Sequence, residues 1–176
     1  MEKKSSGILL YRLTNLKLEV LLVHPGGPFW AKKDLNSWSI PKGEFTEDEN
    51  PFNAAKREFE EEIGIPLSGN FIELTPIRQK NGKQVFCYAC EGNIDPQIIK
   101  SNTFEIEWPT KSGRKQSFPE IDRGEWFDVA KGKLKINEFQ AALIDELVLK
   151  LNLTKDQVSQ DSDGILFDKP SQLDLF

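Results

Sequence analysis

The sequence predicts one α/β (α+β) domain, and two observations carry this prediction. Apolar runs typical of strands come in two groups along the chain, and each group is followed by a segment with helical periodicity. The length of 176 residues allows one domain with a real core and is too short for two large domains. We therefore expect a sheet that packs against helices.

The composition excludes several classes of protein. Hydrophobic residues make up 38% of the chain and charged residues 29%, with a mean hydropathy of −0.47, which is typical of a soluble globular protein. No apolar run reaches the roughly 20 residues of a membrane helix, and no secretory signal is apparent. The two cysteines make a disulfide framework improbable, so we expect a reducing, cytoplasmic compartment. A net charge of −5 disfavours binding of nucleic acid through the whole surface, and we expect no direct nucleic-acid binding.

The first expected strands are residues 7–12 and 18–23, joined by a turn at Thr14-Asn15. Their uninterrupted apolar runs predict strands that are covered on both faces. A loop rich in glycine, proline and aromatic residues follows at 24–30. Residues 38–40 then predict a short strand that stops at Pro41, and residues 42–44 predict a turn or loop.

The clearest predicted helix lies between Asn50 and Gly64. Asn50 is a suitable N-cap, and Pro51 suits the first helical position. Gly64 is a plausible C-cap, and Pro66 prevents the helix from continuing. The apolar residues at helical spacing, which we expect to face the core, are Phe52, Ala55, Phe59 and Ile63.

The second half predicts further strands and one more helix. Residues 71–77 and 84–90 predict a hairpin around Asn81-Gly82. Within the less regular residues 92–119, the period-two segment 103–108 predicts a strand and 111–115 a basic loop. Residues 124–127 predict a strand, and 137–151 predict a helix whose apolar stripe is Phe139, Leu143, Leu147 and Leu151.

Three glutamates share one face of the first helix. Glu58, Glu61 and Glu62 are spaced i, i+3, i+4, which places them within an arc of about 100°. Such a cluster is ordinarily a solvated acidic face. Here the helix follows a glycine-containing turn and carries Arg57 within the cluster, which weakens that interpretation and leaves a site for a hard divalent cation open.

These residues resemble the signature of the Nudix hydrolase family, G-x5-E-x7-R-E-U-x-E-E-x-G-U, where U is a bulky apolar residue. The matching positions are Gly43, Glu49, Arg57, Glu58, Phe59, Glu61, Glu62, Gly64 and Ile65. Phe59 departs slightly, since the family more often has an aliphatic residue there, but the apolar role is kept. The resemblance covers residues 6–153 and implies an α/β/α sandwich around a mixed β-sheet.

The resemblance also implies an activity, a cofactor and the roles of residues. Family members hydrolyse a nucleoside diphosphate linked to another group, with Mg²⁺ or Mn²⁺ bound. Glu58, Glu61 and Glu62 match the metal-binding carboxylates, with the carbonyl near Lys42-Gly43 as a further ligand. Arg57 matches a buried arginine that orients the glutamates together with Glu49. The general base varies within the family.

Two residues are candidates for the general base. One is Glu61, within the signature. The other is Glu120, in a loop before the strand that contains Trp126, although an ordinary exposed glutamate remains equally open there. Glu61, Glu62, Arg57 and Glu120 are therefore the candidate catalytic residues.

The substrate is less determined by the sequence. Lys42, Arg78 and Arg114 are candidate phosphate contacts, although a solvated surface role is open for each. Phe29, Trp30 and Trp108 are candidates for stacking on a base. Nucleoside triphosphates, oxidised nucleotides and dinucleoside polyphosphates all fit. The alternative is a Nudix-fold module that binds a nucleotide without turnover.

Three smaller signals remain. Cys87 and Cys90 would face opposite sides of a strand, which is poor geometry for one metal ion. We expect His24 to lie in a loop and Trp38 to pack in the core.

The last five residues lie at the end of a tail, 154–176, that we expect to be flexible and acidic. They are Gln172, Leu173, Asp174, Leu175 and Phe176, and they resemble the pentapeptide by which bacterial replication and repair proteins dock on the polymerase sliding clamp. A chance match, or packing of the tail on its own domain, is the alternative. Docking would make the chain a clamp-associated module.

Overall fold

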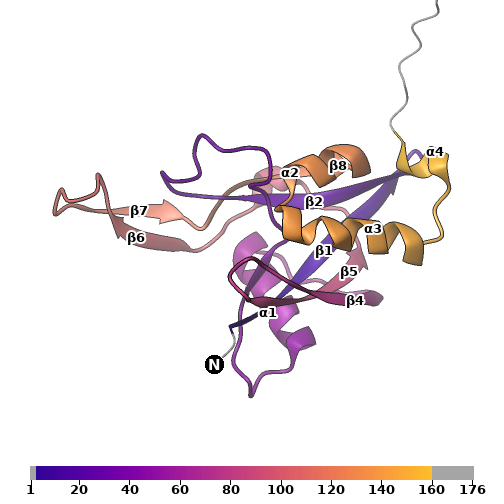
Figure 1. The fold of residues 1–176 in the computed structure, drawn as a ribbon, viewed down its shortest axis with the longest axis horizontal. Helices are drawn as coiled ribbons and strands as arrows, with labels where there is room; N and C mark the ends of the chain where they lie inside the picture. The colour runs from indigo at the N-terminus through magenta and orange to yellow at the C-terminus, as the bar shows by residue number, and fades with distance from the viewer. Residues whose placement is uncertain (1–2, 160–176) are drawn as a thin grey trace, which may run out of the picture.

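A mixed six-stranded sheet forms the centre of the computed structural model, which describes residues 3–159 (Figure 1). Its strand order is β4-β5-β1-β2-β8, with β3 paired to β1; β1 and β5 are parallel and the other pairs are antiparallel. A separate two-stranded sheet contains β6 and β7. The elements are β1 (Lys4–Thr14), β2 (Lys17–Pro25), β3 (Lys42–Glu44), α1 (Pro51–Ile63), β4 (Phe71–Arg78), β5 (Gln84–Glu91), η1 (Pro96–Ile98), β6 (Thr103–Glu107), β7 (Lys115–Pro119), β8 (Ile121–Asp128), α2 (Val129–Lys135), η2 (Glu138–Gln140), α3 (Ala141–Lys150) and α4 (Lys155–Val158).

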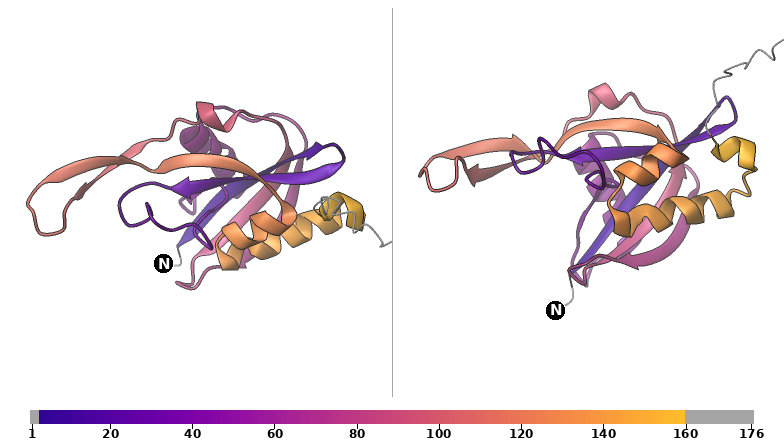
Figure 2. Two further views of the ribbon diagram at one scale, coloured as in Figure 1. Left: turned by 90° about the horizontal axis from the view of Figure 1, so that it is seen from above. Right: turned by 45° about the horizontal axis from the view of Figure 1, so that its top comes forward.

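The two central strands are buried on both faces, as their apolar runs predicted. Ile8 and Leu10 of β1 pack with Phe59 of α1, whereas Leu9 and its neighbours on the other face pack with Leu143 of α3. Figure 2 shows α1 on one side of the sheet and α2 and α3 on the other. This arrangement confirms the predicted α/β/α sandwich, because side chains that alternate along a strand need a helix on each side.

Helix α1 begins and ends where its capping residues predicted. The Asn50 side chain accepts hydrogen bonds from two backbone N–H groups of the first turn, at 2.9 and 3.3 Å, and Pro51 follows it. Gly64 adopts a positive φ of 86° at the C-cap. Phe52 is only half-buried and packs edge-on against aromatic rings of the sheet, while Ala54, which was not predicted in the core, is fully buried.

The segment between β2 and α1 differs from its prediction. Residues 42–44, expected as a turn or loop, form β3, in which Gly43 pairs with Ser6. Residues 38–40 form only isolated bridges, through Ser39 to Val23 and Trp38 to Ile136. Both outcomes depend on partners that are distant in the chain, so the local pattern of these short segments does not reveal them.

The second half contains two further differences. The hairpin β4–β5 and the strand at 103–108 are confirmed, but β7 begins at Lys115, within the predicted basic loop. Helix α2 was missed because only two of its seven residues are buried, so it has no long apolar stripe. The predicted helix at 137–151 starts as the 3-10 turn η2, capped by Asn137, before α3 begins at Ala141.

Helix α4 lies within the segment that the sequence assigned to the tail, and Val158 packs against the core. The expected clamp-docking residues Gln172 to Phe176 lie outside the described residues. Within residues 3–159, no helix is long and apolar enough to cross a membrane.

Asp34 joins the loop after β2 to the core. Its carboxylate accepts a hydrogen bond of 3.0 Å from Nε1 of Trp38, a residue that is buried as predicted, and it is bonded to Nζ of Lys135. These bonds, first from Lys135 and then from Trp38, lower the pKa of Asp34. A carboxylate with a lowered pKa stabilises the fold above its ordinary pKa, and this stabilisation is lost as the pH falls through the lowered value.

We therefore expect Asp34→Asn to lower the free energy of unfolding at pH 7 and to matter progressively less as the pH falls below about 4, near the ordinary pKa of aspartate. Urea unfolding at pH 7 and pH 3, followed by tryptophan fluorescence, measures both values. Asp48→Asn, at an exposed position in the loop before α1, is the matched control. An equal loss of stability at both pH values would contradict the argument.

Candidate active site

The three predicted glutamates lie on one face of α1, at three different depths. Glu58 is buried, with 9% of its surface exposed, and Glu62 is half-buried. Glu61 is the outermost, with 45% of its side chain exposed. The spacing of the residues therefore produces a carboxylate column that runs from the protein interior to solvent.

Arg57 binds the carboxylates from the same helix. Its Nε and Nη2 atoms donate to the two carboxylate oxygens of Glu49, each at 2.9 Å. Its Nη1 atom donates to Glu58 at 2.6 Å and to Glu61 at 3.3 Å. Glu49 first, then Glu58, raises the pKa of Arg57, and Arg57 lowers the pKa of Glu49. One planar cation thus contacts three acidic side chains, although its own side chain is 39% exposed and not buried as the resemblance implied.

Gly43 brings the backbone of β3 against Glu58. A Cβ atom at this position would lie 1.7 Å from Oε2 of Glu58, so any other residue would displace the carboxylate. The pairing of β3 with β1 holds this backbone in place. The glycine is therefore required by a close approach between the strand and the buried glutamate.

Glu62 is held by the neighbouring Lys42. The backbone N–H of Lys42 donates to Oε2 of Glu62 at 2.9 Å. Burial raises the pKa of Glu62 to about 8, against the opposing effect of Lys42. Burial also lowers the pKa of Lys42, and the charge of Glu62 opposes that shift. A carboxylate with a perturbed pKa, placed beside other ionisable groups, is typical of functional sites.

Burial also raises the pKa of Glu58, although its ion pair with Arg57 acts in the opposite direction. The inner two carboxylates are thus destabilised as anions by their surroundings. A cation supplied from outside would relieve this cost.

Glu120 lies near the same carboxylates, at the base of the hairpin β6–β7. Its negative charge contributes to the raised pKa of Glu62. Its backbone N–H donates to Asn102 at 2.8 Å, and its carbonyl accepts from Gly26 at 2.9 Å. The structure therefore brings this second candidate base toward the helix, although it is 58 residues away from Glu62 along the chain.

The predicted phosphate contacts are dispersed. Lys42 lies within the site, next to Glu62. Arg78 is exposed at the end of β4, the edge strand of the sheet, and Arg114 lies at the far end of the hairpin β6–β7. The fold therefore groups Lys42 with the carboxylates and does not group Arg114 with them.

Two partners of this region were not predicted. Lys83 donates to the Glu44 side chain at 2.9 Å, which connects the β4–β5 turn to β3. Asp122 lies 3.0 Å from Nδ1 of His24, whose Nε2 atom donates to the carbonyl of Lys33 at 2.8 Å. No local signal marks the Lys83–Glu44 or the His24–Asp122 contact, because the two residues of each lie 39 and 98 positions apart in the sequence.

The two cysteines confirm their predicted geometry. Cys87 belongs to the core on the α3 side of β5, and Cys90 to the core on the α1 side. Both are free thiols, and burial raises the pKa of each. They cannot act together on one ion.

The donor chemistry of the site fits a hard divalent cation. The Gly43 carbonyl and the carboxylates of Glu58, Glu61 and Glu62 are all oxygen donors, the type that Mg²⁺ prefers. Within residues 3–159, however, no three acidic, histidine or cysteine side chains are gathered closely enough to hold an ion. Glu61 is bonded to Arg57 instead.

Solved structures with the same fold include two proteins of stated function or ligand. An Ap4A hydrolase from C. elegans has a TM-score of 0.57 at 17% identity, over 84% of this chain and 98% of that one. The NUDIX domain of NrtR from Shewanella oneidensis, determined with ADP ribose, has a TM-score of 0.59 at 17% identity, over 86% and 89%. At these identities the likeness shows the fold alone.

The relatives found by sequence match only part of this chain and part of their own length. The mRNA-decapping enzyme subunit 2 of Saccharomyces cerevisiae is 31% identical over 105 residues, which span 56% of this chain but only 9% of that protein. An RNA pyrophosphohydrolase from Hahella chejuensis is 41% identical over 49 residues, or 27% of this chain and 30% of that protein. The model of the NUDIX domain matches residues 3–147, which includes every residue of the site described above. The chain belongs to the Nudix family.

Proposed function

We propose that this protein is a metal-dependent pyrophosphohydrolase that cleaves a phosphoanhydride bond of a nucleotide. The observation that carries the proposal is the column of Glu58, Glu61 and Glu62 beside Gly43, oriented by Arg57. The names of an RNA pyrophosphohydrolase and an Ap4A hydrolase among the similar proteins support the same class of reaction.

The roles of the residues follow from the charge of the substrate, because a pyrophosphate is anionic and repels a nucleophile. Glu58, Glu62 and the Gly43 carbonyl would hold Mg²⁺ or Mn²⁺, the type of cofactor that the family generally uses. Such an ion, when bound, supplies positive charge that offsets the phosphates and acidifies water. Arg57 keeps Glu58 and Glu61 oriented. We assign the acceptance of the water proton to the exposed Glu61, with Glu120 as the second candidate.

A second candidate function is binding of a nucleotide without turnover. The NrtR domain with the same fold was determined with ADP ribose. All three signature glutamates are present in our chain, which favours the enzyme.

Turnover separates these two functions. We expect Mg²⁺- or Mn²⁺-dependent release of phosphate or pyrophosphate from one member of a substrate panel. The panel contains canonical and oxidised nucleoside triphosphates, dinucleoside polyphosphates, ADP-ribose, NADH, nucleotide sugars and 5′-triphosphorylated RNA. EDTA should abolish the activity and excess Mg²⁺ should restore it, because the carboxylates alone supply no positive charge. Activity that persists in EDTA would exclude the metal mechanism, and tight nucleotide binding without turnover would establish the binding module.

Glu62→Gln should lower kcat by at least about 100-fold, since it replaces a carboxylate that would hold the metal ion with an amide of the same shape. Glu60→Gln is the matched control, because Glu60 is exposed on the same helix and lies outside the carboxylate column. Steady-state kinetics on the best substrate of the panel measure both variants. Full activity of Glu62→Gln would refute the assignment of the site.

We also propose, from the sequence, that Gln172 to Phe176 dock on a bacterial sliding clamp. Deleting these five residues should abolish binding to the purified clamp and leave hydrolysis intact, because the segment lies beyond the residues of the site. Unchanged clamp binding in a calorimetric titration would refute the docking.

A further inference from the structure

An apolar groove lies between α2, α3 and α4. It has a volume of about 590 Å³, and its apolar lining consists of Val129, Ala130, Val148, Leu153 and Val158. Ala130 is exposed, and Val148, Leu153 and Val158 are only half-buried. A hollow with apolar walls is suited to apolar side chains, because their transfer out of water is favourable. We call this hollow the helical groove.

Helix α4 forms one wall of the helical groove and depends on its surroundings. It has only four residues, Lys155–Val158, and a helix this short does not persist in water by itself. A capping box closes its first turn, in which the backbone N–H of Thr154 donates to the Gln157 side chain at 2.9 Å. Val158 packs against the core. A cover over the groove would therefore stabilise α4 as well.

The chain leaves α4 at the edge of the helical groove. Ser159, the last described residue, lines the groove itself. Its backbone N–H donates to the carbonyl of Lys155 at 2.9 Å, and its own carbonyl accepts from Nζ of Lys17 at 3.1 Å. The segment that follows Ser159 therefore starts beside the groove.

Residues 165–167 are the first apolar group beyond this point. They are Ile, Leu and Phe, and the turn-forming pair Asp163-Gly164 stands directly before them. The six residues from Ser159 to Ile165 span at most about 20 Å when extended. Helix α3 has 10 residues and is therefore about 15 Å long. The three apolar side chains can thus reach the whole length of the helical groove along α3.

The charges of the helical groove and of this segment are complementary. The charged residues of the described lining are Lys133 and Lys155, both basic, although Lys133 also pairs with Asp145 at 2.6 Å. Residues 160–168 contain three aspartates and neither lysine nor arginine. Opposite charges beside an apolar surface favour the correct partner and fix its orientation. The helical groove therefore suits this acidic and apolar segment.

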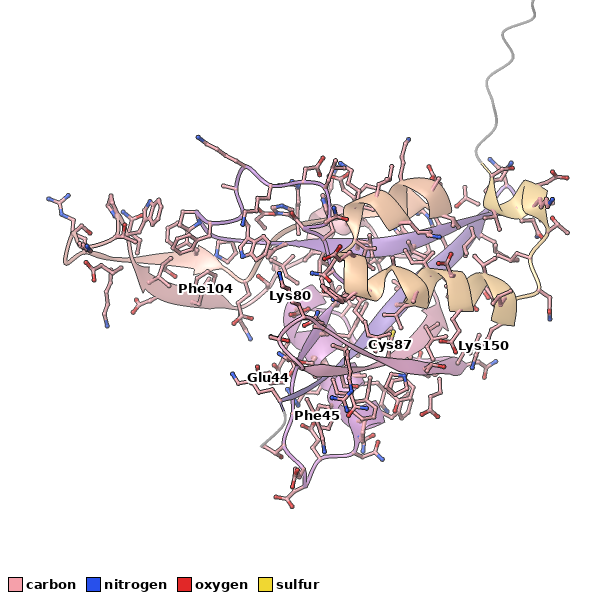
Figure 3. The ribbon with its side chains drawn as sticks, in the orientation of Figure 1. Glu44, Phe45, Lys80, Cys87, Phe104 and Lys150 are labelled. Atoms are coloured by element: carbon pink, nitrogen blue, oxygen red, sulfur yellow. The ribbon has the colours of Figure 1, made fainter. Side chains whose placement is uncertain are left out.

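The helical groove lies apart from the carboxylates. Figure 2 shows α2 and α3 on the side of the sheet opposite α1. Figure 3 labels Lys150, which stands in the chain between the lining residues Val148 and Leu153, far from Glu44 of β3. A segment bound in the groove therefore leaves the proposed active site open.

We propose that the helical groove is a docking site for residues 165–167 of the same chain. The chain turns back at Asp163-Gly164, and the three apolar side chains cover the apolar lining, with the preceding aspartates toward Lys155. The docked segment holds α4 against α2 and α3. It leaves residues 172–176 outside the groove, so they stay available to a partner. This inference goes beyond the proposed function and does not depend on it.

The test uses the full chain with isotope-labelled valine and leucine methyl groups, observed by NMR. Nuclear Overhauser contacts should connect Ile165 and the ring of Phe167 with the methyl groups of Val148 and Val158. Phe167→Ser should shift these methyl signals and remove the contacts of Ile165, because the apolar segment no longer binds. Phe176→Ser is the matched control, since it makes the same change at a residue that the proposal leaves outside the groove.

A change in the groove itself provides the second variant. Ala130→Glu places a carboxylate in the lining at an exposed helical position, where substitutions affect folding little. It should abolish the contacts of Phe167, because it repels the aspartates and places a charge on the apolar surface. Ala142→Glu, at an exposed position of α3 outside the described lining, is its control.

Three results would overturn the proposal. In the first, neither Phe167→Ser nor Ala130→Glu changes the methyl signals of the groove, so the segment is not bound there. In the second, Phe176→Ser changes them as much as Phe167→Ser or more, which makes the distal apolar residues the occupant. In the third, the wild-type signals shift on dilution, which makes a second copy of the chain the occupant. None of these measurements requires turnover, so their outcome is separate from that of the proposed function.

Discussion

The ion pairs of Arg57 are the interaction on which the site depends. Like charges three and four residues apart on a helix repel each other, and burial of Glu58 and Glu62 adds a desolvation cost. The Arg57 guanidinium offsets this repulsion on the helix itself. Because Arg57 also donates hydrogen bonds to both carboxylate oxygens of Glu49, the same cation connects α1 to the loop before it. A lysine could not do both, since it lacks the planar fork of donors.

The sheet makes this arrangement possible by supplying a rigid, apolar support. β1 is buried on both faces, and its pairing with β3 places the Gly43 backbone directly against Glu58. Helix α1 is fixed at both ends by its caps and along one face by Phe59 and Ile63. Strong capping and packing can therefore support a polar face that is unfavourable by itself.

The placement of charged residues on the surface describes this protein better than its net charge does. A net charge of −5 describes the whole surface, yet the acidic column of α1 lies apart from Lys111, Arg114 and Lys115 at the end of β6–β7. The sequence argument against nucleic-acid contact used the average charge. The hairpin carries both these basic residues and the acidic Glu105 and Glu107, a local distribution that an average does not describe.

The sequence by itself determined the elements whose causes are local. Capping residues set the ends of α1, apolar runs identified β1 and β2, Asn81-Gly82 located the β4–β5 turn, and the spacing of the glutamates placed them on one face. The tertiary structure decided what depends on distant partners. It made residues 42–44 a strand, brought Glu120 toward Glu62, buried His24 beside Asp122 and placed Phe29 against Trp108. The physical reason is that the packing of the whole core determines which distant strands pair. A short stretch of sequence therefore does not identify its own partner.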